Sequence, residues 1–419
     1  MWKASFSIFL CALMVPQAYS DELSLNWDWT VSMDQIEHRE SVFFLPANES
    51  KENTVNALLD VEARYKGWVG LFALSVDNLY SNVTSKTDSD FVVQELFTQG
   101  SISAGDTSFD YLLGKARIDW GVGYGYRPLD IFKPYRRNPV GIQIEEGAGT
   151  AMLSYFDMDG EWSLIYTDSS WNNQNGTELQ ELSEQQGVGA RRYWFSGDSE
   201  YQVIAYYDDV RHGLVGTSWV TVIDSAWEVH MSGLYQRKFH SYILPASSQE
   251  PVTEGGQTNG VQGLLGLNWA NESGNQVILE YWYDNRGWSK GEWDSAFSVV
   301  DALPDTYKDL GYSYANGFNH VNLVQHNIML HWSLDGSALS ATRNEYHWME
   351  NITPTFDIIY SPSDSGFIAT QWLSFLVQDT GASRFEIELA ARFYTGDSNS
   401  VYANLPDKHK VLLNLKGRF

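Results

Sequence analysis

Residues 23–33 read LSLNWDWTVSM, in which apolar side chains occupy the odd positions and polar side chains occupy the even positions. Successive side chains of a β-strand point to opposite faces, so this segment is predicted to be a strand with one apolar and one polar face. The same alternation recurs in residues 55–65, 227–235, 277–283, 385–393 and 411–419. Because it recurs along the whole chain, it predicts an all-β protein.

The alternation predicts eighteen strands, with sixteen as the alternative. They cover residues 22–33, 54–65, 67–77, 89–101, 107–119, 149–156, 160–168, 187–195, 199–207, 213–222, 226–237, 260–270, 276–284, 321–333, 337–348, 365–378, 384–394 and 408–419. Short turns, such as 157–159, 197–198 and 334–336, alternate with connections that include the long loops 34–53, 120–148, 169–186, 238–259 and 285–320. This sorting is typical of a single antiparallel transmembrane β-barrel with short periplasmic turns and long extracellular loops.

The composition agrees with a membrane barrel. Aromatic residues make up 15 % of the chain and charged residues 19 %, which excludes a disordered protein. After the first 20 residues no apolar run reaches the roughly 18 residues of a membrane-spanning helix, which excludes a helical membrane protein. Inside a bilayer all backbone polar groups must pair internally, so alternating strands must close into a barrel. Tryptophans near strand ends, such as Trp27 and Trp162, are expected in interfacial girdles.

Residues 1–20 have the features of a cleaved signal peptide, and residues 21–419 are predicted to form the barrel. Lys3 is followed by the apolar segment 8–15 and by the small-residue site Ala18-Tyr19-Ser20. Cys11 is the single cysteine, so the mature chain contains no disulfide. The formal charge of −26 argues against binding to nucleic acid. A solvated acidic surface is the simpler interpretation, and surface binding of divalent cations is the alternative.

The C-terminal residues 411–419, VLLNLKGRF, resemble the last strand of Gram-negative outer-membrane β-barrels. The resemblance implies an outer-membrane location and identifies Phe419 as the assembly signal read by the barrel-insertion machinery. Residues 113–121, LGKARIDWG, followed by Arg127-Pro128-Leu129-Asp130, are similar to a strand and loop of poorly characterised proteobacterial porin-like families. This narrower resemblance implies membership of a class and identifies no substrate.

Motifs for covalent chemistry are weak. The segment Gly121-Val122-Gly123-Tyr124-Gly125 does not lead into a helix, so a bent strand end is favoured over a phosphate-binding loop. His230-x-Ser232 resembles the His-x-Ser pair of outer-membrane phospholipases but lacks the expected Asn, so a polar pair in the lumen is favoured. His326 and His331 fall on opposite strand faces. No enzyme activity, cofactor or metal site is therefore predicted.

Charged residues predicted to face the lumen are the candidates for the pore. On 107–119 the apolar residues Leu112, Gly114, Ala116 and Ile118 are assigned to the lipid face. The predicted pore-lining or constriction residues are Lys115, Arg117, Asp119, Arg127, Asp130, Arg136, Arg137, Glu280, Arg384, Glu386, Glu388 and Arg392. Mutual salt bridging that only fills the barrel is the alternative. The loops 121–149 and 285–320 are the candidates for narrowing an eighteen-stranded barrel, which is too wide for wall side chains to fill.

Together these features predict an outer-membrane channel for passive, porin-like passage of small solutes. Its expected partners are outer-membrane lipid, lipopolysaccharide, the barrel-insertion machinery and a small solute. The alternatives are an export or surface-assembly barrel, a barrel enzyme, and a structural barrel whose acidic loops bind cations or lipopolysaccharide.

Overall fold

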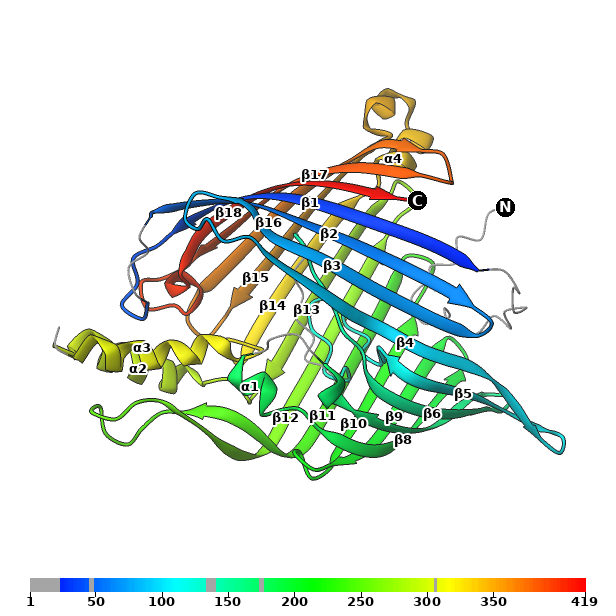
Figure 1. Ribbon diagram of the computed structural model, residues 1–419, viewed down its shortest axis with the longest axis horizontal. Helices are drawn as coiled ribbons and strands as arrows, with labels where there is room; N and C mark the ends of the chain where they lie inside the picture. The colour runs from blue at the N-terminus through cyan, green and yellow to red at the C-terminus, as the bar shows by residue number, and fades with distance from the viewer. Residues whose placement is uncertain (1–22, 45–48, 133–140, 173–176, 305–306) are drawn as a thin grey trace.

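The computed structural model describes residues 23–44, 49–132, 141–172, 177–304 and 307–419. These residues form one antiparallel sheet of 18 strands that closes into a barrel, because β1 pairs with both β2 and β18 (Figure 1). The predicted eighteen-stranded barrel is thereby confirmed, and the alternative of sixteen strands is wrong. The predicted signal peptide, residues 1–20, lies outside the described residues.

The strand bounds follow the predicted ones over most of the chain. The strands are β1 (Ser24–His38), β2 (Lys51–Tyr65), β3 (Trp68–Ser81), β4 (Asp88–Ala104), β5 (Thr107–Ala116), β6 (Ala148–Phe156), β7 (Gly160–Asp168), β8 (Gln186–Ser196), β9 (Ser199–Asp208), β10 (Leu214–Val222), β11 (Trp227–Ile243), β12 (Thr253–Ala270), β13 (Asn275–Asp284), β14 (His326–Leu334), β15 (Ile352–Ser361), β16 (Gly366–Asp379), β17 (Arg384–Thr395) and β18 (Asp407–Arg418).

The ends of the chain close the barrel. Val31 of β1 lies opposite Leu415 of β18, and the backbones of Trp27 and Phe419 exchange two hydrogen bonds of 3.0 Å. The rings of Trp27 and Phe419 also stack, with centroids 4.6 Å apart. The terminal aromatic residue therefore completes the seam at the end of the barrel that holds the C-terminus, which we call the turn end. The opposite end is the loop end.

Strand β1 shows the two faces that the alternation predicts. Leu25 and Trp27 are exposed on the outside, whereas Ser32 on the other face is buried. In a barrel of this width the outward apolar side chains meet the lipid and the inward polar side chains line the interior. The alternation in 23–33 therefore predicts both the strand and its orientation correctly.

The predicted lipid face of β5 is wrong. Leu112 is 5 % exposed and packs with Val69 and Phe97 of neighbouring strands, whereas Leu113 is 47 % exposed. The outward-facing positions of β5 are therefore shifted by one residue from the predicted ones. The prediction placed Ile118 in the same alternation, although Ile118 lies beyond the end of the strand. Gly114 has φ +133°, a conformation that interrupts the regular alternation where the chain leaves the wall.

The predicted strand 337–348 is also wrong. Residues Gly336–Thr342 form helix α4, and Asn344–Met349 form a 3-10 helix, while the missing strand is β15. Asp335 caps α4 by accepting hydrogen bonds from the backbone N–H groups of Ser337 and Ala338. This connection, residues 335–351, is therefore long although it lies at the turn end with the C-terminus (Figure 1). The other turn-end connections are short, as predicted.

The predicted loop 238–259 is largely strand, because β11 and β12 continue as a hairpin beyond the predicted bounds. The loop end also carries α1 (Glu178–Glu181), α2 (Lys290–Ala302) and α3 (Lys308–Ser313). Phe43, Tyr242, Trp293 and Tyr402 from four separate connections or strand ends join one buried apolar cluster there. None of the described helices is long and apolar enough to cross a membrane.

Candidate solute pathway

We call the connection between β5 and β6, residues 117–147, the inward loop, because its described parts, 117–132 and 141–147, turn into the barrel. Its residues 133–140, with the predicted Arg136 and Arg137, lie outside the described part of the chain. Trp120, Leu129 and Ile131 pack against wall residues of β7, β9, β10 and β11, among them Ile165, Ile204, Leu214 and Leu234. Further along, Ile142 and Ile144 pack against β2, β3 and β4. The described parts of this loop thus touch both sides of the lumen and narrow it.

Glu280 of β13 fixes the middle of the inward loop to the wall. Its carboxylate is buried and accepts backbone hydrogen bonds from Tyr124 (2.6 Å) and Gly125 (2.7 Å). His230 of β11 lies 2.9 Å away through Nε2 and completes the arrangement. A Cβ on Gly125 would lie 2.4 Å from the sulfur of Met329, so only glycine fits this approach. The glycine-rich segment is therefore an anchored loop, not the bent strand end that the sequence favours.

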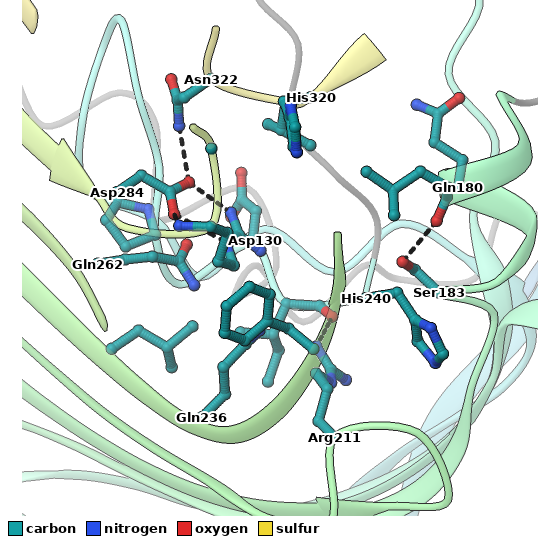
Figure 2. A pocket seen from close by; sticks show the side chains of 18 of the residues that line it. Asp130, Gln180, Ser183, Arg211, Gln236, His240, Gln262, Asp284, His320 and Asn322 are labelled. Atoms are coloured by element: carbon teal, nitrogen blue, oxygen red, sulfur yellow. Dashed lines mark hydrogen bonds and ion pairs between the residues drawn. The ribbon is translucent and has the colours of Figure 1, made fainter. Parts of the chain in front are cut away.

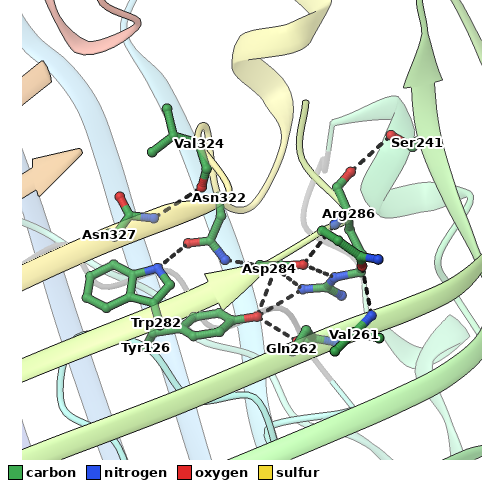
Figure 3. Close-up of polar contacts among 11 residues, drawn as sticks. Tyr126, Ser241, Val261, Gln262, Trp282, Asp284, Arg286, Asn322, Val324 and Asn327 are labelled. Atoms are coloured by element: carbon green, nitrogen blue, oxygen red, sulfur yellow. Dashed lines mark hydrogen bonds and ion pairs between the residues drawn. The ribbon is translucent and has the colours of Figure 1, made fainter. Parts of the chain in front are cut away.

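A second anchor joins Tyr126 to the ends of β12 and β13. The Tyr126 hydroxyl lies 2.6 Å from Oε1 of Gln262 and 2.8 Å from Oδ2 of Asp284 (Figure 3). Arg286 donates to Asp284 at 2.7 Å and to the same hydroxyl at 3.3 Å. Burial raises the pKa of Tyr126 well above its usual value, so its hydroxyl stays protonated. Asn322 adds a further donor to Asp284 at 2.8 Å.

Asp130 shapes the start of the inward loop. Its Oδ1 accepts from the backbone N–H groups of Trp120 (3.1 Å) and Gly121 (2.8 Å), and its Oδ2 lies 3.1 Å from Nε of Arg127. Burial raises the pKa of Asp130 to about 6, and the neighbouring Arg127 opposes this shift. Asp130 is therefore a carboxyl in the inward loop that titrates close to neutral pH.

A cavity of about 110 Å³ lies beside the inward loop, towards the loop end (Figure 2). Its lining combines charged and amide side chains with apolar ones. They include Arg127, Asp130, Phe132, Arg211, Leu234, Phe239, Gln262, Asp284 and Arg286. We call this cavity the loop pocket. A solute moving past the inward loop on this side would contact these groups.

The other predicted lumen residues lie in separate places, each in contact with a neighbour. Lys115 is buried, 3.5 Å from Glu146, and Arg117 lies 3.3 Å from Glu95 and 3.4 Å from Glu145. Asp119 is exposed where the inward loop begins. The structure therefore brings Arg127, Asp130 and the network around Glu280 and Asp284 towards one region, and leaves Lys115 outside it.

The predicted residues of β17 lie along another part of the wall. Glu388 is buried, 3.0 Å from Lys416 and 2.6 Å from Asn414, and the guanidinium of Arg392 lies 5.5 Å from the ring centre of Tyr394. Arg384 lies 3.2 Å from Glu386 and lines a cavity of about 750 Å³ at the turn end. The charges of both signs predicted for this strand are therefore largely paired with neighbours.

Sequence reasoning missed Arg211, Arg286, Tyr126 and Gln262. The sequence does contain a signal for the two arginines. Each lies two or three positions after an aspartate that ends a strand and faces inward, as in Asp284-Asn285-Arg286. Such an arginine can reach back to its aspartate. Among the described residues, no group of three or more His, Cys, Asp or Glu side chains is arranged to hold a metal ion.

Solved structures of bacterial outer-membrane channels share this architecture. OccAB1 of Acinetobacter baumannii superimposes with a TM-score of 0.58 at 10 % sequence identity, covering 96 % of this chain and 98 % of that one. A BenF-like porin of Pseudomonas fluorescens Pf-5 gives a TM-score of 0.55 at 8 % identity, covering 95 % and 98 %. OccK2 (OpdF) of Pseudomonas aeruginosa, solved in complex with glucuronate, gives a TM-score of 0.52 at 9 % identity, covering 96 % and 99 %.

No protein-family model matches the sequence, and no curated protein sequence matches it significantly. At 8–10 % identity the three structural likenesses establish the fold. The chain therefore has the same fold as these proteins, a closed antiparallel β-barrel of eighteen strands.

Proposed function

We propose that this protein is an outer-membrane channel through which small solutes pass by diffusion. The observation that carries the proposal is the inward loop, which Glu280 fixes to the opposite wall. A loop held across a wide barrel by buried hydrogen bonds narrows the lumen to a defined passage, as a size- or charge-selective channel requires. The glucuronate bound to OccK2, a barrel of the same fold, supports a small molecule as the solute.

The proposal includes the orientation and the route to the membrane. Residues 1–20 serve as the signal peptide, the turn end faces the periplasm, and the loop end faces outward, in contact with lipopolysaccharide. The barrel-insertion machinery recognises β18 and Phe419. No covalent reaction is included, because the Ser232 hydroxyl has no hydrogen-bond partner among the described residues and His230 binds Glu280.

A second candidate is a closed barrel with a structural role. The apolar cluster at the loop end favours it, because the cluster packs α2 against residues of other connections, including Phe43, Val252 and Tyr402. A well-packed cover of this kind would obstruct a solute if it spanned the whole mouth.

Swelling of proteoliposomes in sugars of increasing size distinguishes the two candidates. A channel gives rapid swelling with small sugars and slower swelling as the sugar approaches the size of the constriction. A closed barrel gives no swelling above that of protein-free liposomes with any sugar, and this result would overturn the proposed function.

A further inference from the structure

A groove of about 420 Å³ lies on the outside of the wall at the loop end, over β8 to β11, which neighbour one another in the barrel (Figure 1). Tyr206 of β9 points inward, because its ring packs 5.4 Å from that of Phe132 in the inward loop. The next residue, Tyr207, therefore points outward, and it is 59 % exposed. We call this site the outer groove, and its exposed lining residues are Val188, Ala205, Tyr207, Val215, Tyr235 and Arg237.

Small residues form the floor of the outer groove. In the row nearest the loop end, Gly213 lies between Tyr207 and Arg237: a Cβ on Gly213 would lie 3.8 Å from the Tyr207 ring, and its carbonyl accepts the backbone N–H of Arg237 at 2.9 Å. In the next row towards the turn end, Ala205 pairs with Val215. Gly213 has φ +115°, a conformation that residues with a Cβ rarely adopt, so the gap between the two large side chains depends on glycine.

Two basic side chains lie at the rim of the outer groove. Arg237 lines the groove, Lys238 follows it directly in β11, and both are exposed. The alternation of the wall is broken here, because the flanking residues Gln236 and Phe239 are both buried and both line the loop pocket. On β12, Asn259 lies between the partners of Gln236 and Lys238 and has φ +62°. This irregularity places two adjacent cations at the rim.

Neither Arg237 nor Lys238 forms an ion pair with another described residue. The two acids at the end of β9 are engaged elsewhere, because Asp208 is buried and Asp209 accepts a hydrogen bond of 2.8 Å from the backbone N–H of Gln186. Acidic residues outnumber basic ones by 53 to 27 in this chain. Two basic side chains that nevertheless lack an acidic partner favour an anion from outside the chain.

From this arrangement we infer that the outer groove binds lipid A, the membrane anchor of lipopolysaccharide. One acyl chain lies in the groove, and a phosphate lies on Arg237 and Lys238. A guanidinium can bind phosphate through two parallel hydrogen bonds, which suits Arg237 to this role. The groove extends from the basic rim towards the turn end, as an acyl chain extends from its head group into the hydrocarbon core.

The tyrosines of the outer groove fit the same depth in the membrane. Aromatic side chains of membrane barrels gather at the boundary between hydrocarbon and water. The Tyr235 hydroxyl donates to Asn259 at 2.8 Å, so the polar end of this side chain is satisfied beside the basic rim. The inference rests on the proposed outward orientation of the loop end, because lipopolysaccharide occupies only the outer leaflet of the membrane.

Native mass spectrometry of the full-length barrel, released from detergent after incubation with lipid A, tests this inference. Phosphatidylglycerol at equal concentration is the comparison, because it is also anionic and acylated. We expect the wild type to retain lipid A in preference to phosphatidylglycerol. Arg237→Gln is expected to weaken lipid A retention about tenfold, the effect of losing a charge-assisted hydrogen bond.

Ala205→Leu is the second variant, because it fills the floor of the outer groove and keeps the lipid face apolar. We expect it to weaken lipid A retention about fivefold, through crowding of the acyl chain. Val203→Leu is its control, since Val203 lies on the same face of β9 and does not line the groove. Lys86→Gln is the control for charge, because Lys86 is exposed in the connection between β3 and β4. Heat-modifiable migration on gels verifies that each variant is folded.

Three results would overturn the inference. They are no retained lipid A, phosphatidylglycerol retained as strongly as lipid A, and lipid A retention unchanged in either folded variant. A dimer of the barrel that is lost in Ala205→Leu would also overturn it, because the groove would then be an interface between two copies.

Lipid retention is measured independently of liposome swelling, so the two proposals can fail separately. A barrel that supports swelling and retains no lipid A keeps the channel function and loses the lipid site. A barrel that retains lipid A and gives no swelling keeps the lipid site and loses the channel function.

Discussion

The carboxylate of Glu280 accepts a hydrogen bond of 2.6 Å from the backbone N–H of Tyr124, 156 residues earlier in the chain. One residue belongs to a wall strand and the other to the inward loop, so this contact decides where the loop crosses the lumen. The neighbouring Gly125 and His230 bind the same carboxylate. Three groups, two from the inward loop and one from β11, therefore meet at one buried acid.

Glu280→Ala is expected to release the inward loop. The change leaves His230 and two backbone N–H groups without their acceptor, and removing one partner of such a buried arrangement costs about 3 kcal/mol. Open-channel current noise should increase, and the temperature at which the folded band is lost on gels should fall. Glu386→Gln, at the turn end, serves as a control and should leave both quantities close to wild type. Quiet, unchanged currents in Glu280→Ala would contradict the anchoring role.

Arg117→Gln is expected to shift the reversal potential towards cation preference. Arg117 is partly exposed and faces Glu95 and Glu145, so its removal leaves two uncompensated carboxylates where the inward loop begins. Lys115→Gln should instead reduce stability, because it leaves Glu146 buried without its ion pair. The lipid-exposed Leu113→Ile should change neither. Unchanged selectivity in Arg117→Gln would mean that ions pass elsewhere.

Asp130 is expected to make ion selectivity depend on pH, with a midpoint of about 6. Below this pH the carboxyl is neutral, so the positive charge of Arg127 is no longer compensated by Asp130. Acidification from pH 7 to 5 should therefore move the ion selectivity towards anions. Because its pKa is raised on folding from 3.8, this group favours the folded loop most below 3.8, and that contribution is lost as the pH rises through 6. Asp130→Asn should give the low-pH selectivity at both pH values. A full pH step in the variant would assign the effect to another group.

Deletion of Phe419 is expected to impair assembly. The residue forms two backbone hydrogen bonds with Trp27 and stacks on its ring, so the deletion opens the seam between β1 and β18 at the turn end. Unfolded protein should accumulate in the periplasm, and the heat-modifiable band should be lost. Phe419→Tyr retains the aromatic ring and should insert like the wild type. Efficient insertion of the truncated chain would show that the terminal residue is dispensable.

The number of strands and most of their faces follow from side-chain alternation, because the lipid imposes a period of two on every exposed strand. The errors have local causes. Pro354 obscures β15, since proline lacks the N–H that a strand normally uses, although it pairs with Leu373 here. In β5, Gly114 has a positive φ that interrupts the alternation of inward and outward side chains, and the pattern of apolar residues does not predict such a conformation.

The candidate site was less predictable than the wall. Glu280 could be assigned to the lumen from its strand, but its partners Tyr124 and Gly125 lie in a loop whose path depends on tertiary packing. The positions of Arg211 and Gln262 around one pocket likewise depend on barrel closure and on the inward loop. Sequence periodicity describes neighbours along a strand and carries no information about contacts across the lumen.

Single-channel conductance in a planar bilayer tests the central claim most directly, with the wild type compared to a variant in which a short Gly-Ser segment replaces residues 122–145. A channel narrowed by the inward loop predicts discrete current steps for the wild type and clearly larger steps for the shortened variant. If the wild type gave no steps while the shortened variant conducted, the loop would be a plug and the barrel closed, and the account would be contradicted.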